Sequence, residues 1–246
     1  MFKRRPLPDH LNVPWRVRDA LILVVAWFGL QIVLGGVLDV VAIWVPVLKH
    51  FLQGAVHGDV VPSFVINLIS IGIGFGILAL YLRKYRVGWD VVGLRRVGIL
   101  RTAKYLALIL ISFVVLANLA LALFTLLPGF NADQPQINEF TSSIRSHQVL
   151  AFMALVLLPP IFEETIFRGF IFPAIAKRTG MIWGAILSSL LFGLAHGQAN
   201  LFVYTSILGM LLCFMYVRLR STVPGILLHM LNNYLAFLAL LAHTGK

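Results

Sequence analysis

Seven long runs of apolar residues divide the chain, separated by shorter polar or charged segments. They cover residues 20–45, 61–82, 105–127, 149–170, 181–196, 201–217 and 223–242. A helix needs about 20 consecutive, mostly apolar residues to cross the hydrocarbon core of a bilayer. The pattern therefore predicts an all-α protein, a polytopic membrane helical bundle with about seven transmembrane helices, in which the runs 181–196 and 201–217 are short.

Composition agrees with a membrane protein. The chain is 60% hydrophobic and only 12% charged, and its mean hydropathy is +0.93. A soluble domain of this size would carry about 25% charged residues. The sequence contains no internal repeat, low-complexity tract or soluble domain, and we predict a single membrane domain over residues 1–246.

The basic residues are unevenly distributed along the chain. The net charge is +11, and with the N-terminus in the cytoplasm most of the 20 Lys and Arg fall in cytoplasmic segments. This bias follows the positive-inside rule, so we expect a cytoplasmic N-terminus and an external C-terminus. The orientation of the chain in the lipid bilayer then explains the excess of positive charge, which argues against nucleic acid as a partner. Trp15, with Arg16 and Arg18, is expected to anchor the chain at the interface. Without a recognisable organelle-targeting extension, we expect a prokaryotic plasma membrane.

Three charged residues lie inside one apolar run: Glu163, Glu164 and Arg168. The chain has only nine Asp and Glu, and a charge at the centre of a bilayer costs about 2.5–3.5 kcal/mol even on insertion scales. Glu164 and Arg168, at i and i+4, share a helix face and are predicted to form an ion pair. Glu163 points about 100° away and is the candidate general base. The alternative is a salt bridge that only stabilises the helix.

Two further polar groups occur in apolar runs. His196 follows Phe192 by four residues at the end of one run, and Asn233 follows His229 by four residues in the last run. Taken alone, His196 is more often an interfacial or hydrogen-bonded histidine. His229 and Asn233 are equally typical of polar contacts between membrane helices. Together with the glutamate pair, they favour a common polar chamber.

The motifs occur in a fixed order along the chain: Glu163-Glu164-x-x-x-Arg168, Phe192-x-x-x-His196 and His229-x-x-x-Asn233. This ordered set resembles the CPBP (Abi) family of intramembrane proteases, which includes the CAAX prenyl endopeptidases related to Ras-converting enzyme. The resemblance covers about residues 145–240, which it implies are the catalytic core. By the resemblance, Glu164 and Arg168 shape or support the active site.

The resemblance also implies roles for the other motif residues. Glu163 activates water with the assistance of His196, and His229 with Asn233 binds the developing oxyanion. Members of the family are often labelled metalloproteases, and Glu163, His196 and His229 are the ligands if Zn²⁺ is bound. No His-Glu-x-x-His motif occurs, so the usual helical zinc scaffold is absent and metal-free chemistry is favoured. No other cofactor is expected.

We therefore expect a membrane endopeptidase that hydrolyses lipidated, membrane-anchored or hydrophobic peptide substrates. The resemblance implies a substrate with a prenylated C-terminus, and processing of a signalling peptide or a bacteriocin-like leader is equally compatible with the sequence. A proton-coupled transporter is one alternative, because intramembrane Glu and His residues also serve as proton relays. A non-catalytic membrane scaffold is the other.

Overall fold

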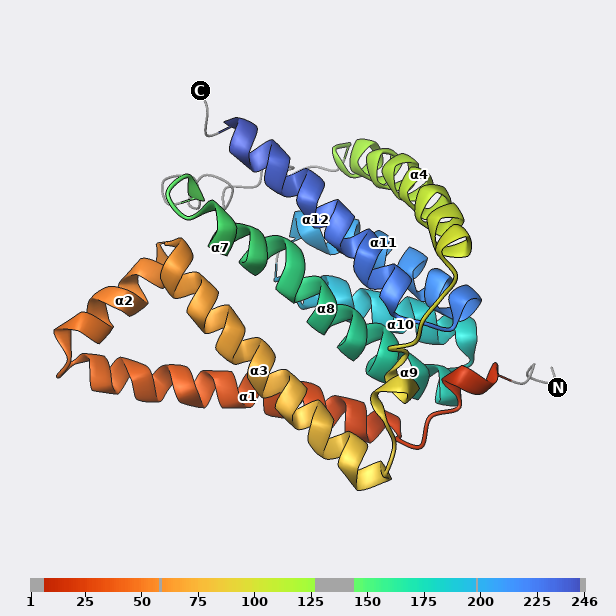
Figure 1. Ribbon diagram of the computed structural model, residues 1–246, viewed down its shortest axis with the longest axis horizontal. Coiled ribbons are helices and arrows are strands. Elements are labelled where there is room, and N and C mark those ends of the chain that lie inside the picture. Colours follow the sequence, from red (N-terminus) through yellow and green to blue (C-terminus); the bar gives the residue numbers. More distant parts are fainter. Residues whose placement is uncertain (1–6, 58, 127–143, 198, 244–246) are drawn as a thin grey trace. The chain divides into compact units, whose positions relative to one another are not determined.

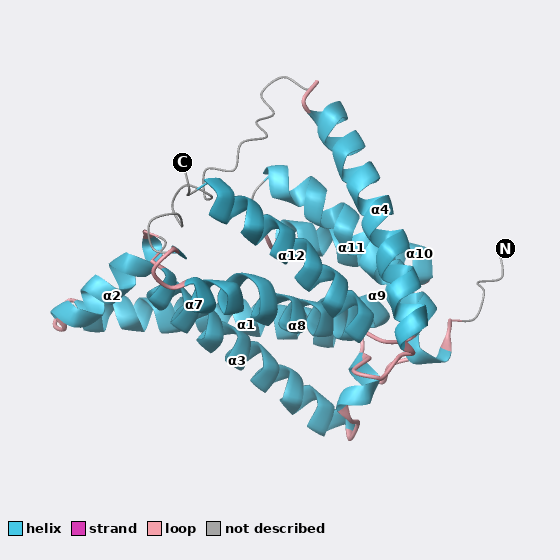
Figure 2. Ribbon diagram, turned by 45° about the horizontal axis from the view of Figure 1, so that its top comes forward, coloured by secondary structure: helices cyan, strands magenta, loops and turns pink. Residues whose placement is uncertain are grey.

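The computed structural model describes residues 7–57, 59–126, 144–197 and 199–243. Every element in this part of the chain is helical and none is a strand (Figure 2), which confirms the predicted all-α class. The elements, in chain order, are η1 Asp9–Leu11, α1 Val17–Ala42, α2 Pro46–Val56, α3 Val60–Tyr85, η2 Trp89–Val92, α4 Ile99–Phe124, α7 Gln148–Phe152, η3 Met153–Leu157, α8 Leu158–Glu164, η4 Thr165–Ile171, α9 Phe172–Thr179, α10 Met181–Leu194, α11 Ala199–Leu219 and α12 Val223–His243.

Within the described ranges, six helical segments are long and apolar enough to cross a membrane. These are Val17–Ala42, Val60–Tyr85, Ile99–Phe124, Gln148–Thr179, Leu201–Leu219 and Val223–Ala242. The seventh predicted run, 181–196, corresponds to α10, an apolar helix of 14 residues. At 1.5 Å per residue, α10 is about 21 Å long, which is shorter than the hydrocarbon core of about 30 Å. The chain is therefore an integral membrane protein with a helical bundle architecture.

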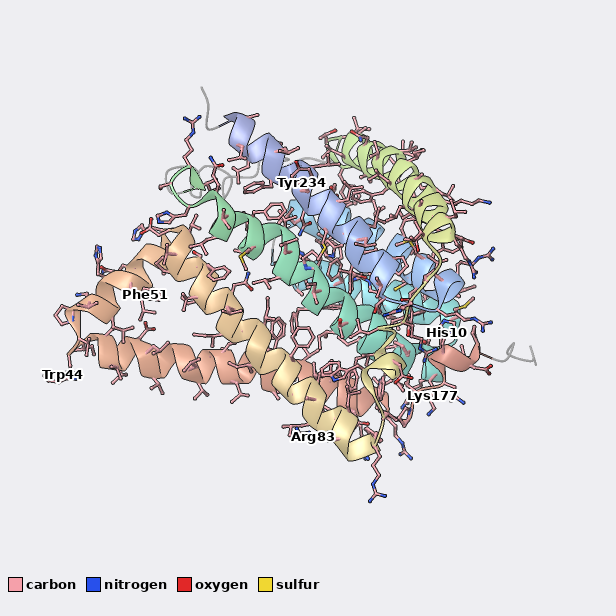
Figure 3. The ribbon with its side chains drawn as sticks, in the orientation of Figure 1. His10, Trp44, Phe51, Arg83, Lys177 and Tyr234 are labelled. Atoms are coloured by element: carbon pink, nitrogen blue, oxygen red, sulfur yellow. The ribbon has the colours of Figure 1, made fainter. Side chains whose placement is uncertain are left out.

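Large apolar side chains cover much of the outer surface of the helices. Ile32 on α1 is 74% exposed and Leu100 on α4 is 88% exposed. Trp44, which follows α1 and is labelled in Figure 3, is 81% exposed. Exposed apolar surface of this kind is unfavourable in water but favourable in contact with lipid acyl chains. These faces are consistent with lipid contact.

The chain divides into two compact units. The first comprises Met1–Ala20, Tyr85–Asp133 and Glu163–Leu228, and the second comprises Leu21–Lys84, Gln134–Phe162 and His229–Lys246. Both units combine segments from distant parts of the sequence, and residues 145–240 contribute to both. The single membrane domain with a catalytic core over 145–240 stays a prediction.

In the first unit, α10 packs against α9 and α11, and α11 also packs against α4 (Figure 1). Ile109 and Phe113 from α4 are buried with Leu208 and Leu212 from α11. A second buried cluster joins Leu11 of η1 to the α9 and α11 helices. Apolar packing between helices thus positions α9, α10 and α11, the elements that flank the motif residues of this unit.

In the second unit, polar contacts join α1 to α3. The indole Nε1 of Trp27 donates to the backbone oxygen of Ser70 at 2.8 Å, and the Ser70 hydroxyl donates to Gln31 Oε1 at 2.8 Å. Phe162 packs against Trp27, with ring centroids 5.0 Å apart. Gly74 makes this possible, because a Cβ there would collide with the Phe162 ring.

The segment from Gln148 to Thr179 is one helical run that contains two π-helical stretches. Met153–Leu157 and Thr165–Ile171 are π-helical, and the parts before, between and after them are α-helical. Pro159 and Pro160 lie in the first turn of α8. A proline within a helix removes a backbone donor and its ring clashes with the carbonyl four residues earlier. We attribute the first π-helical segment to this pair, since such wide turns are common where the regular ladder is interrupted.

Candidate active site

Glu164 and Arg168 form the predicted ion pair. Nη1 of Arg168 lies 2.9 Å from Oε1 of Glu164, and each side chain is only 1% exposed. The Arg168 guanidinium also stacks over Phe192, with Cζ 4.2 Å from the ring centroid. A buried pair of this kind is costly to desolvate, and removing one partner typically costs about 3–5 kcal/mol. The positive charge of Arg168 therefore neutralises the negative charge of Glu164 in an otherwise apolar interior.

Two glycines make room for this pair. A Cβ on Gly225 would lie 3.1 Å from Oε2 of Glu164, and a Cβ on Gly209 would lie 3.2 Å from Nη2 of Arg168. Gly225 lies near the start of α12 and Gly209 lies within α11. Sequence reasoning missed both, and a glycine inside an apolar helix was the available signal.

Glu163 occupies a different environment from its neighbour. Its side chain is half-buried, whereas Glu164 is buried. This difference agrees with the rotation of about 100° between consecutive helical residues. Glu163 is therefore the residue of the pair that retains some exposure, although its Oε2 atom is buried.

His196 follows α10 and is oriented by Phe192. Its Nδ1 lies 2.8 Å from the backbone oxygen of Phe192, and its ring meets the Phe192 ring edge-on at 4.8 Å. Because a carbonyl oxygen can only accept, Nδ1 carries the hydrogen, and in the neutral imidazole Nε2 is the proton acceptor. Phe192 thus contacts both Arg168 and His196, and it is fully buried.

Asn233 has a specific partner within the second unit. Its Nδ2 donates to the backbone oxygen of Leu155 at 2.9 Å, and Asn232 Nδ2 donates to Asn233 Oδ1 at 3.2 Å. Pro159 and Pro160 occupy the positions four and five residues after Leu155, so neither can donate an N–H to its carbonyl. The Asn233 amide replaces that missing donor. His229, one helical turn earlier, is buried with 4% of its side chain exposed.

The predicted site residues therefore form two groups. Glu163, Glu164, Arg168 and His196 belong to the first unit, and His229 and Asn233 belong to the second. Within the described part of the chain, no group of three or more His, Cys, Asp or Glu is arranged to hold a metal ion. The ligand set Glu163, His196 and His229, which was predicted in case Zn²⁺ is bound, draws on both units and stays a prediction.

The segment that carries the motifs is similar to a known family. Residues 145–235 match the family described as type II CAAX prenyl endopeptidase, Rce1-like. The protein "Putative membrane peptidase YdiL" of Bacillus subtilis (strain 168) is 33% identical over 89 residues, which is 35% of this chain and 36% of that protein. The match thus spans about a third of the length of this curated relative. No solved structure matches the chain.

All three motifs fall inside the matched segment. The resemblance to the CPBP family is therefore confirmed: residues 145–235 of this chain match the Rce1-like family of type II CAAX prenyl endopeptidases.

Proposed function

We propose that this chain is a membrane endopeptidase that hydrolyses peptide bonds in lipidated, membrane-anchored or hydrophobic peptides. The observation that carries the proposal is the pairing of two adjacent carboxylates with different environments in the Rce1-like segment. Glu164 is buried and neutralised by Arg168 at 2.9 Å, whereas Glu163 is half-buried. A structural salt bridge requires one acid, and the second carboxylate beside it is the proposed base.

In the proposed reaction, the Glu163 carboxylate accepts a proton from water while the water oxygen attacks the carbonyl carbon of the scissile bond. The Nε2 atom of His196 accepts a hydrogen bond from the same water and orients it. The proton then passes to the amide nitrogen, the C–N bond breaks, and a carboxylate and an amine leave. General acid–base catalysis of this kind contributes about 10²–10⁴ in rate.

His229 and Asn233 are proposed to stabilise the oxyanion of the tetrahedral intermediate. An amide carries two hydrogens, and Asn233 directs one of them to Leu155. The other is the proposed donor to the oxyanion. Loss of one such donor typically costs about 2.7–4 kcal/mol of transition-state stabilisation. The hydrogen bonds at Leu155 and Asn232 hold the amide in one orientation, which is what preorganised stabilisation requires.

The test compares wild type with Glu163→Gln, which is nearly isosteric but cannot accept a proton. Asp39→Asn is the matched control, because Asp39 is another carboxylate in an apolar helix, outside the motifs. Purified proteins in lipid nanodiscs are given a fluorogenic peptide with a prenylated C-terminus and the same peptide without the prenyl group. We expect Glu163→Gln to lose cleavage and Asp39→Asn to retain it. Retention of cleavage by Glu163→Gln would show that Glu163 is not the base.

Two further experiments test the alternatives of a zinc-dependent mechanism and of a non-catalytic scaffold. A chelator followed by added zinc leaves cleavage unchanged in the metal-free mechanism, whereas loss and zinc-dependent recovery supports the alternative with Zn²⁺. Quantitative proteomics of membranes from cells expressing each variant identifies precursors that accumulate with Glu163→Gln. A cellular phenotype that persists fully in Glu163→Gln supports a scaffold instead.

A further inference from the structure

A basic pocket lies in the first unit, outside the motif residues. It has a volume of about 340 Å³ and is lined by Arg16, Val17, Arg18, Ala174, Lys177 and Arg178. The four cationic side chains are exposed, and none of the described residues that line the pocket is acidic. The volume is at the lower end of the range for small-molecule sites, about 300–1,000 Å³.

The two segments that form this basic pocket are joined by specific contacts. Trp15 donates from Nε1 to the backbone oxygen of Phe170 at 2.9 Å and stacks on the Phe170 ring at 4.5 Å. Nζ of Lys177 donates to the backbone oxygen of Val13 at 2.8 Å. Trp15 was expected to anchor the chain in the interface, but it is fully buried in protein. Its role is to hold the N-terminal segment against the motif-bearing helix.

The basic pocket lies where two candidate spans end. Arg16 and Arg18 flank the first residue of α1, and Lys177 and Arg178 are in the last turn of α9 (Figure 3 labels Lys177). Charged residues at the ends of spans lie at the level of the lipid headgroups. Lipid phosphates are therefore the anions that such a pocket meets at the highest local concentration.

Asp19, which follows the basic pocket residue Arg18, is held by partners of its own. Asp19 is buried, and its Oδ2 accepts hydrogen bonds from the Arg16 backbone N–H and the Tyr85 hydroxyl, both at 2.8 Å. Its Oδ2 atom is thus bound by Tyr85 and by the backbone just before α1. Like charges gathered in one hollow repel one another, and an anion bound among them lowers this repulsion.

We propose that the basic pocket binds the phosphate group of an anionic phospholipid headgroup. Arginine presents a planar fork of N–H donors that matches two phosphate oxygens, and lysine adds a point charge. A headgroup with an additional ammonium group is disfavoured, because the ammonium would meet the same four cations. The site distinguishes anionic from zwitterionic lipids, and it is independent of the proposed peptidase chemistry.

The test measures lipid binding to the full chain in detergent by native mass spectrometry. The ligands are phosphatidylglycerol and phosphatidylcholine with the same acyl chains, and inorganic phosphate serves as a soluble competitor. The variant is Arg16→Gln with Arg18→Gln. The control is Arg96→Gln with Lys104→Gln, which removes the same charge from exposed positions that do not line the pocket. We expect the pocket variant to weaken phosphatidylglycerol binding by about tenfold or more and the control to change it little.

Several outcomes would overturn the proposal. Equal losses in both double variants indicate general attraction to positive charge rather than a site. Equal binding of the two lipids to wild type removes the anionic preference. Displacement of phosphatidylglycerol by inorganic phosphate at equal concentration indicates that the pocket takes soluble phosphate instead. If the double variant is not recovered folded, as judged by circular dichroism, the single change Arg18→Gln replaces it, and its control is Arg96→Gln.

Discussion

Asn233 donates its side-chain amide to the backbone oxygen of Leu155 at 2.9 Å. The sequence explains why this carbonyl needs a partner from outside its own helix. Pro159 and Pro160 stand where the α-helical and π-helical donors to Leu155 would be, and neither has an N–H. Asn233 is therefore a structural residue whatever else it does, and its proposed role as an oxyanion donor must be separated from this one.

A double-mutant cycle makes that separation. We expect Asn233→Ala to lower the free energy of unfolding by about 1–3 kcal/mol, because it removes the Asn233 donor from a carbonyl in a half-buried residue. Pro159→Ala restores an N–H four residues after Leu155, so in that background the cost of Asn233→Ala should fall. Thermal unfolding in detergent measures the coupling. If Asn233 also binds the oxyanion, Asn233→Ala should lower cleavage activity in both the wild-type and the Pro159→Ala background. If Pro159→Ala restores activity together with stability, the role of Asn233 is structural only.

The Glu164–Arg168 pair should be much more sensitive to loss of one partner than to loss of both. Arg168→Met leaves a buried carboxylate without its cation, and we expect a loss of about 3–5 kcal/mol of stability. Combining Arg168→Met with Glu164→Gln should recover a large part of it. Arg96→Met, at an exposed position, is the control and should cost little. A drop below about 1 kcal/mol for Arg168→Met would mean that water reaches the pair.

Adding a side chain at Gly225 should destabilise the protein. A Cβ there would lie 3.1 Å from Oε2 of Glu164, so Gly225→Ala forces either the carboxylate or α12 to move. We expect a lower melting temperature and a lower rate of cleavage. Gly29, also within a helix, has nothing within 4 Å of a Cβ. Gly29→Ala should be neutral or stabilising by up to about 1 kcal/mol, and equal effects of the two substitutions would argue against the close approach at Glu164.

His196 can be tested by a substitution that keeps its hydrogen bond but removes its basicity. In the wild-type protein, His196 Nδ1 lies 2.8 Å from the Phe192 backbone oxygen. The amide nitrogen of Asn occupies a position close to that of Nδ1, so His196→Asn should retain this hydrogen bond. It supplies no basic nitrogen at the position of Nε2. We expect near-normal stability with cleavage reduced by about 10²–10⁴. Full activity in this variant would assign His196 a purely structural role.

His10 should make stability depend on pH. Its side chain is 8% exposed, and burial, together with the nearby Arg220 and Arg95, lowers its pKa from 6.5 to about 4. In the unfolded chain the imidazole takes up a proton near pH 6.5, whereas the folded protein resists protonation until about pH 4. The unfolded state therefore binds more protons between these values, and stability falls as pH falls through this window, by up to about 1.4 kcal/mol per pH unit.

Unfolding measured from pH 7 to pH 5 tests this dependence on His10. His10→Phe keeps an aromatic ring against Tyr216, whose centroid is 5.4 Å away, and should flatten the pH profile. His57→Gln changes an exposed histidine and should leave the slope unchanged. An unaltered slope in His10→Phe would place the titrating group elsewhere.

Local patterns anticipated the features that depend on helical geometry. The ion pair of Glu164 and Arg168 was predicted because residues four apart share a face, and the different burial of Glu163 follows from the same periodicity. The identity of Asn233's partner was not predictable in this way. Leu155 lies 78 residues away along the chain, and no periodic pattern relates the two positions.

The sequence by itself determined the membrane class, the helical spans and the set of motifs on which the family resemblance rests. These features depend on transfer of apolar residues into lipid and on hydrogen bonds within single helices, and both are local properties. Only the tertiary structure decided that Trp15 is buried against Phe170, that glycines admit the charged pair, and that four cations surround one pocket. These features arise from packing between segments distant in sequence, where the shape and depth of each contact depend on all its neighbours at once.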